Sequence, residues 1–141
     1  MTLADFIKTN KGKKVDFDKA YGAQCVDLFR QYAKDVLGIE EHTGPCQTTG
    51  GAKDLFCDYD KMPGEKKYFN KYTHNRNTVY KTGDVVIWNK TDKNSFGHVA
   101  IFINVVDKDN FIVFEQDGFA QAGAVLNIRS KTNLLGCLRK K

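Results

Sequence analysis

The chain has 141 residues, of which 41% are hydrophobic and 28% charged, and this predicts one compact domain spanning residues 1–141. Two prolines and the lack of low-complexity runs exclude long disordered segments, and no apolar run approaches a membrane span. A net charge of +5 predicts attraction to a nucleic acid, a membrane surface or an anionic wall polymer. The basic residues are dispersed and accompany no nucleic-acid motif, so a solvated basic surface is favoured, with neither nucleic-acid binding nor membrane insertion expected.

The N-terminal stretch MTLADFIKTNKGKK is expected to hold a short helix over residues 3–9, with Thr2 as its cap. Its acidic and polar residues stand where a secretory signal would carry an unbroken apolar run, so no signal peptide is expected. The next stretch, DFDKAYGAQCVD (residues 16–27), sets one cysteine among three aspartates. Nearby negative charge favours a neutral thiol, which makes these surroundings unusual for a nucleophile.

Residues 24–37 show the apolar spacing of an amphipathic helix that ends at Gly38. Cys25 lies in its first turn and shares a face with Leu28, Phe29 and Tyr32, so the thiol is expected to point toward whatever this helix packs against.

The remaining elements are predicted from composition and alternation. Residues 40–82 are expected to form loops with one short helix near residues 51–59. From Gly83 onward, β-rich runs separated by turn residues predict an antiparallel meander. Its strands are expected at residues 84–88, 98–106, 111–115, 124–129 and 134–139. Helices followed by strands indicate an α+β fold, with the second helix laid across the sheet.

The four cysteines lack the paired spacing of a zinc site, and the nearby His42 and His74 are irregularly placed. Cys46 and Cys57 could pair in an oxidising environment, but reduced thiols are the default expectation.

His98 begins an apolar strand and Glu115 ends the next one. A hairpin around residues 107–110 brings these two ends near each other, although not directly opposite. A histidine there is often structural, but a carboxylate at a buried strand end needs a partner. Together with Cys25 at a helix N-terminus, they supply the nucleophile, base and orienting group of thiol catalysis, and the Gln24 amide suits an oxyanion hole.

The segments YGAQCVDLFRQYA, GDVVIW, GHVAIF and FEQDG, in this order, resemble the CHAP domain (cysteine, histidine-dependent amidohydrolase/peptidase) of bacteriophage endolysins. The resemblance implies a papain-like α+β fold, with N-terminal helices packed on an antiparallel sheet. It also implies hydrolysis of peptidoglycan amides, with Cys25 as nucleophile, His98 as base and Glu115 as the orienting residue. Where many members have asparagine this chain has Asp117, and an ionised aspartate would be a poor oxyanion donor.

One interpretation of the three aspartates is structural: two are solvated loop carboxylates, and Asp27 is a first-turn residue stabilised by the helix dipole. Their alternation favours a calcium loop instead, because Ca²⁺ takes six to eight oxygen ligands. The expected ligands are Asp16, Asp18, the carbonyls of Ala20 and Gly22, and Asp27. Some phage CHAP domains resemble this segment in having calcium at matching positions.

The function expected from these features is that of a peptidoglycan hydrolase, an endopeptidase or N-acetylmuramoyl-L-alanine amidase. It would be a monomer, made in the host cytoplasm and acting at the wall of gram-positive bacteria. Two alternatives remain: a papain-like hydrolase of another amide, and a calcium-stabilised binding or virion structural module with a decayed site.

Overall fold

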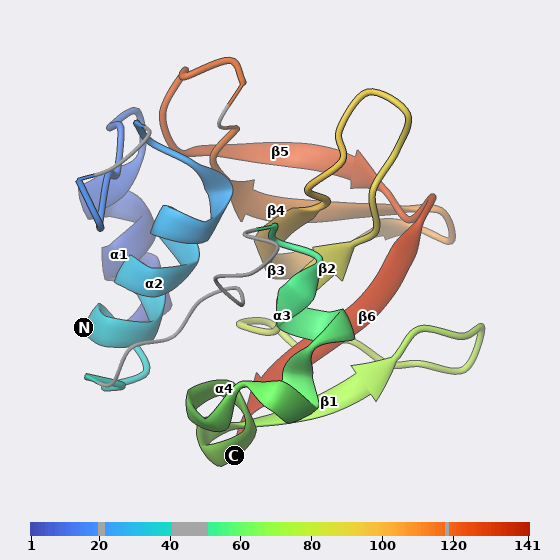
Figure 1. The fold of residues 1–141 in the computed structure, drawn as a ribbon. Coiled ribbons are helices and arrows are strands. Elements are labelled where there is room, and N and C mark those ends of the chain that lie inside the picture. The colour runs from blue at the N-terminus through green and yellow to red at the C-terminus, as the bar shows by residue number, and fades with distance from the viewer. Residues whose placement is uncertain (20–21, 41–50, 118) are drawn as a thin grey trace.

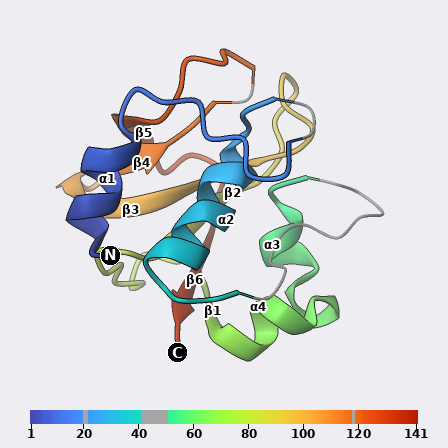
Figure 2. The ribbon, with the colours of Figure 1, turned by 90° about the vertical axis from the view of Figure 1, so that its left-hand side faces the viewer.

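A computed structural model describes residues 1–19, 22–40, 51–117 and 119–141 (Figure 1). The helices are α1 (Leu3–Asn10), α2 (Cys25–Asp35), α3 (Asp54–Cys57), the 3-10 turn η1 (Tyr59–Lys61) and α4 (Pro63–Tyr68). The strands are β1 (Phe69–Thr73), β2 (Val85–Trp88), β3 (His98–Asp107), β4 (Asn110–Glu115), β5 (Val125–Ser130) and β6 (Leu134–Lys140). Helices α1 and α2 lie in front of the sheet in Figure 2. This arrangement confirms the predicted α+β class and the predicted helices before residue 40.

Within the described residues, six strands form one antiparallel sheet in the order β1-β6-β2-β3-β4-β5. The predicted meander is correct for β2 to β5 but wrong for β6, which returns to pair with β2 on one side and β1 on the other. Pairing with β6 satisfies the backbone of β2 on the side away from β3, whereas β5 remains an edge strand.

The prediction of loops over residues 40–82 was wrong for α4 and β1, while residues 41–50 lie outside the described part. Strand β1 has the sequence FNKYT, and only Phe69 in it is buried. The strand is held by main-chain pairing with β6 rather than by its side chains. Its sequence therefore carries little of the apolar alternation from which a strand is predicted.

Alternating side chains of the central strands form cores on opposite faces of the sheet. Val85, Ile87 and Ile101 pack in the cluster that includes the helices, whereas Val86 and Phe102 pack in a second cluster. Phe6 of α1 is fully buried in the first cluster. Because these strands are covered on both faces, they read as continuous apolar runs in the sequence.

The apolar face of helix α2 packs against the sheet and fixes the position of the helix. Its apolar residues, among them Leu28, Phe29 and Ala33, join the helix-side core. Tyr32 contacts Phe6 edge to face, with ring centroids 5.7 Å apart, and donates a hydrogen bond to the Gly83 carbonyl at 2.8 Å. These contacts hold the helix against the sheet, and its first residue, Cys25, lies beside His98 at the start of β3.

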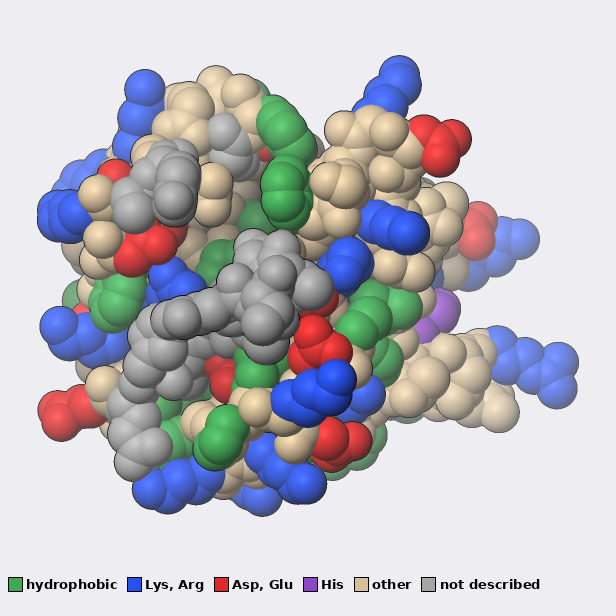
Figure 3. Space-filling model, viewed as in Figure 1, with side chains coloured by type: hydrophobic (Ala, Val, Ile, Leu, Met, Phe, Trp, Pro, Cys, Tyr) green, Lys and Arg blue, Asp and Glu red, His purple; other side chains and the backbone are tan. Residues whose placement is uncertain are grey.

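On the face seen in Figure 1, Lys and Arg side chains lie scattered around the outline, with acidic side chains among them (Figure 3). On this face the positive charge is therefore dispersed, as the sequence predicted. No helix among the described residues has both the length and the apolar character needed to cross a membrane.

Candidate active site

Cys25 is the first residue of α2, and Gln24 is its N-cap in an extended conformation. The Gln24 N–H donates to Asp27 Oδ2 at 3.0 Å, so the Asp27 carboxylate closes the first turn. The Cys25 side chain is half-buried at the positive end of the helix, where the dipole favours negative charge.

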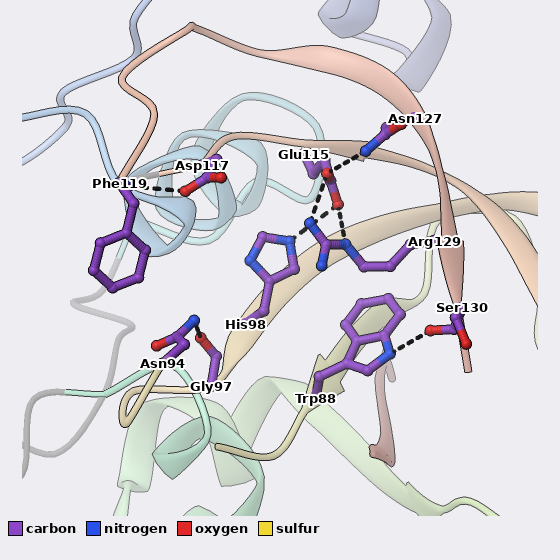
Figure 4. A network of polar contacts seen from close by, with 10 residues as sticks. All are labelled: Trp88, Asn94, Gly97, His98, Glu115, Asp117, Phe119, Asn127, Arg129 and Ser130. Atoms are coloured by element: carbon purple, nitrogen blue, oxygen red, sulfur yellow. Dashed lines mark hydrogen bonds and ion pairs between the residues drawn. The ribbon is translucent and has the colours of Figure 1, made fainter. Parts of the chain in front are cut away.

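His98 meets Glu115 through the register of two strands. Ile101 of β3 opposes Phe114 of β4, so Glu115 lies opposite Ala100 and diagonal to His98 on the same face. His98 Nε2 lies 3.0 Å from Glu115 Oε1 (Figure 4). The sequence-based placement, near but not directly opposite, is confirmed.

Glycine is required immediately before His98. Gly97 has a φ of +76°, and a Cβ at this position would lie 2.5 Å from the Trp88 carbonyl oxygen. The GH pair in the sequence therefore reflects a close approach of β2 to the start of β3 that leaves no room for a side chain.

The Glu115 carboxylate is buried and has partners besides His98. Arg129 Nε and Nη2 donate to its two oxygens at 2.6 and 2.9 Å, and Asn127 Nδ2 donates to Oε2 at 2.9 Å (Figure 4). Burial by itself would raise the pKa of Glu115, but the hydrogen bonds from His98, Arg129 and Asn127 hold it well below the usual range.

Arg129 and Asn127 were not predicted as site residues from the sequence. They stand two residues apart on β5, so they share a face of the strand that pairs with β4. Two polar side chains at alternate positions of a strand beside a buried carboxylate are the signal that could have found them.

His98 is itself buried. Burial would lower its pKa, but hydrogen-bonding interactions with Cys25 and Glu115 raise it to about 9. Since Nε2 faces Glu115, Nδ1 is the ring nitrogen left for the thiol. At neutral pH the imidazole is therefore protonated beside the Cys25 side chain.

Trp88 packs beside the imidazole, opposite His98 in the β2–β3 register, with ring centroids 5.8 Å apart. Its indole N–H donates to the Ser130 carbonyl at 2.9 Å, and the Arg129 guanidinium lies 5.7 Å from its ring centroid. The ring therefore restricts His98 on one side and links β2 to the end of β5.

Cys25 and His98 line one cleft of about 360 Å³, in which Gln24 and Asp117 also lie. Asp117 is exposed, and its Oδ1 accepts hydrogen bonds from the N–H groups of Phe119 at 2.8 Å and Ala120 at 3.4 Å. The structure thus brings together all five residues predicted for catalysis, and Asp117 holds a turn at the edge of the cleft.

The predicted metal ligands Asp16, Asp18 and Asp27 are also close together, with one carboxylate oxygen of each within 4.8 Å of the others. Asp16 Oδ1 is buried without a hydrogen-bond partner in the described structure, whereas Asp18 pairs with Arg30 at 3.0 Å. Burial raises the pKa of Asp27, and the charges of Asp18 and Asp16 raise it further. The three carboxylates therefore repel one another.

Of the two predicted carbonyl ligands, Ala20 lies outside the described residues. Gly22 has a φ of +75°, and a Cβ there would lie 2.8 Å from Gln121 Oε1. Gln121 in turn pairs with the Ala23 backbone through both ends of its amide, at 3.1 and 3.0 Å. Glycine is therefore the residue that this turn accepts.

Gln116 connects the aspartate segment with the start of α2. It too was not predicted as a site residue from the sequence. Its fully buried amide donates to the carbonyls of Val15 at 2.7 Å and Gln24 at 2.8 Å, and accepts from the Val15 N–H at 2.8 Å. Because Gln116 follows Glu115 directly, one short segment holds the orienting carboxylate and the loop before the nucleophile.

The other described cysteines have different surroundings. Cys57 is exposed. Cys137 is buried 3.6 Å from Asp84, and burial with this carboxylate raises its pKa to about 12. His74 Nδ1 lies 2.7 Å from the Tyr80 hydroxyl. Cys46 and His42 lie outside the described residues, so pairing of Cys46 with Cys57 stays a prediction.

Residues 14–117 match the CHAP domain family. Endolysin PlyTW of Staphylococcus phage Twort is 32% identical over 99 residues, which cover 70% of this chain and 19% of that protein. The D-alanyl-L-alanine endopeptidase of Streptococcus phage B30 is 31% identical over 102 residues, covering 72% of this chain and 21% of that protein. The chain thus spans about a fifth of the length of these relatives.

The fold has matches among solved structures. The crystal structure of the endolysin LysIME-EF1 superposes on 99% of this chain and 64% of its own, with a TM-score of 0.67 and 21% identity. The family match, the relatives and the arrangement of Cys25, His98 and Glu115 agree with one another. The chain belongs to the CHAP domain family.

Proposed function

We propose that this chain is the catalytic part of a peptidoglycan hydrolase, which cleaves a wall amide as an endopeptidase or N-acetylmuramoyl-L-alanine amidase. The observation that carries the proposal is the 3.0 Å contact between His98 Nε2 and Glu115 Oε1, beside a cysteine at a helix N-terminus. The names of the relatives, an endolysin and a D-alanyl-L-alanine endopeptidase, support this reaction class.

The first half of the reaction is acylation of Cys25. The Sγ thiolate attacks the amide carbonyl carbon, and the negative charge that develops on the oxygen is stabilised at the N-terminus of α2, with the Gln24 amide as a donor. The His98 imidazolium gives its Nδ1 proton to the amide nitrogen as the C–N bond breaks. The amine leaves, and a thioester on Cys25 remains.

The second half is hydrolysis of this thioester. Neutral His98 accepts a proton from water as the water oxygen attacks the thioester carbon, and the C–S bond then breaks. The acid product leaves, and the imidazolium and thiolate are restored. Glu115 stabilises the imidazolium and holds one ring orientation in both halves, as a carboxylate kept ionised by Arg129.

We also propose that Asp16, Asp18 and Asp27 hold a calcium ion. Three carboxylate oxygens within 4.8 Å of one another, one of them buried without a partner in the described structure, fit a hard dication with oxygen ligands. When bound, the ion would offset the mutual repulsion of these carboxylates and the negative field near Cys25. The carbonyls of Ala20 and Gly22 are proposed to complete the ligand set.

The wall is the proposed place of action, and the dispersed basic surface would favour contact with anionic wall polymers. The chain is proposed to act as a monomer.

The proposal is tested by lysis of gram-positive cell walls, measured as loss of turbidity. Cys25→Ala should abolish lysis because it removes the nucleophile, whereas Cys57→Ala should retain it because Cys57 is an exposed thiol away from the cleft. Full lysis by Cys25→Ala would overturn the proposal. Failure of a thiol-reactive probe to label Cys25 in preference to Cys57 would favour a decayed site.

A further inference from the structure

Two hollows meet at His98. The first is the cleft that contains Cys25, and the second is a pocket of about 340 Å³ that shares Asn94, Gly97 and His98 with it. Figure 4 shows the His98 ring between Asp117 and Phe119 on one side and Trp88 and Ser130 on the other. The imidazole therefore stands at the boundary between the two hollows.

The two parts differ in chemistry. The Cys25 side includes the apolar side chains Val26, Ala52, Phe96 and Phe119. The second pocket has a rim of hydroxyls and amides, and none of the described residues that line it is acidic. Besides the shared Asn94 and His98, its polar lining comprises Asn89, Thr91, Arg129, Ser130, Thr132 and Asn133.

The second pocket is held in shape by hydrogen bonds between its two walls. The Asn89 N–H donates to the Asn133 carbonyl at 2.8 Å, and the Trp88 indole donates to the Ser130 carbonyl at 2.9 Å. The hydroxyls of Ser130 and Thr132 lie 2.9 Å apart. The polar rim is therefore formed by two segments that are tied together.

We propose that this second pocket is the leaving-group subsite, and that it takes the amine portion of the substrate as a short polar peptide. The inference rests on the proposed function, in which His98 protonates the departing nitrogen. A group that receives its proton from His98 leaves on the histidine side of Cys25, and the pocket beyond the imidazole is the one rich in hydrogen-bonding groups. The acyl portion then occupies the apolar Cys25 side.

The same subsite can be probed with an added amine in place of water. The amine nitrogen attacks the thioester carbon, neutral His98 accepts the N–H proton, and the C–S bond breaks. The products are a new amide, with the Cys25 thiolate and the His98 imidazolium restored, so no other reactant is needed.

The test digests gram-positive peptidoglycan with added glycylglycine or butylamine, compared at equal concentrations of free amine. Mass spectrometry measures the ratio of amide product to acid product. With glycylglycine the ratio should saturate, because the dipeptide binds before it reacts, whereas with butylamine it should rise linearly.

Two variants test whether glycylglycine binds in the second pocket. Thr132→Val and Asn133→Gly each remove a polar group from the rim, and glycine keeps the backbone of Asn133, which has a φ of +67°. Each should raise the half-saturating glycylglycine concentration about two- to tenfold, as loss of one hydrogen bond does. Lys93→Ala, an exposed change in the same loop as Asn94, should not.

Linear dependence on both amines, or unchanged half-saturation in both variants, would overturn the subsite if the chain still cleaves walls. If the chain releases no wall fragment at all, both the proposed function and the subsite fail.

Discussion

Arg129 holds Glu115 by two hydrogen bonds, from Nε to Oε1 at 2.6 Å and from Nη2 to Oε2 at 2.9 Å. The same Oε1 lies 3.0 Å from His98 Nε2. The carboxylate that orients the imidazole is thus itself oriented, from a strand that carries none of the site residues predicted from the sequence. Glu115 raises the pKa of His98 and the Arg129 charge lowers it, so substitutions at the two positions should shift this pKa in opposite directions.

We expect Glu115→Gln to lower the pKa of His98 from about 9, because the carboxylate favours the imidazolium. Acylation needs the protonated ring, so the alkaline limb of the kcat/KM profile should move to lower pH. Two-dimensional NMR of the imidazole through a pH titration checks the pKa directly. An unchanged pKa in a folded variant would contradict the orienting role.

Arg129→Met should have the opposite effect on the imidazole. The guanidinium charge lowers the pKa of His98, so its removal should raise this pKa, provided that Glu115 stays in place. Loss of the hydrogen bonds should also cost about 1.5 to 3 kcal/mol of unfolding free energy, nearer the lower figure because the Arg129 side chain is 33% exposed. Arg129→Lys is the matched control, since it keeps the charge but loses the paired geometry.

Stability should depend on pH through His98. Its folded pKa of about 9 lies above the ordinary 6.5, so its stabilising contribution is fully present below about 6.5. It is lost as the pH rises through about 9. Urea unfolding at a series of pH values should show a falling free energy across this window, and a smaller fall in His98→Gln. Equal slopes in the two proteins would exclude this linkage.

Calcium should raise the melting temperature if the aspartate cluster binds it. At a concentration one hundred times Kd, the native state gains about 2.7 kcal/mol. Asp16→Asn should cancel this gain, yet leave the chain in EDTA as stable or slightly more stable, because it removes one of three repelling charges. Asp92→Asn, an exposed change outside the cluster, serves as the control. Identical melting in calcium and EDTA would argue for ordinary loop aspartates.

Gln116→Ala should destabilise the fold by about 1 to 3 kcal/mol, since it leaves backbone groups of Val15 and Gln24 without their buried partner. Wall lysis should fall as well, because the loop before Cys25 loses its tether. Gln31→Ala removes one hydrogen bond, to Asp35 at 2.8 Å, from a partly exposed position on α2, and should cost less. Unfolding curves in denaturant compare the two variants.

The sequence by itself determined the local features of this protein. The amphipathic run before Gly38 and the continuous apolar strands predicted their elements closely, because side-chain periodicity directly records which face is buried. The order of the motifs around Cys25, His98 and Glu115 predicted the family. The aspartate cluster was visible for the same reason, since its members lie close together along the chain.

Only the tertiary structure decided which distant strands meet. The return of β6 to β2, the pairing that places Arg129 and Asn127 behind Glu115, and the tether from Gln116 to Val15 all depend on register between separate segments. Local periodicity states which side of a strand is buried but not its neighbour, which is selected by long-range pairing and packing. The pocket beyond His98 is formed in the same way, by strand ends and loops that meet only in the folded chain.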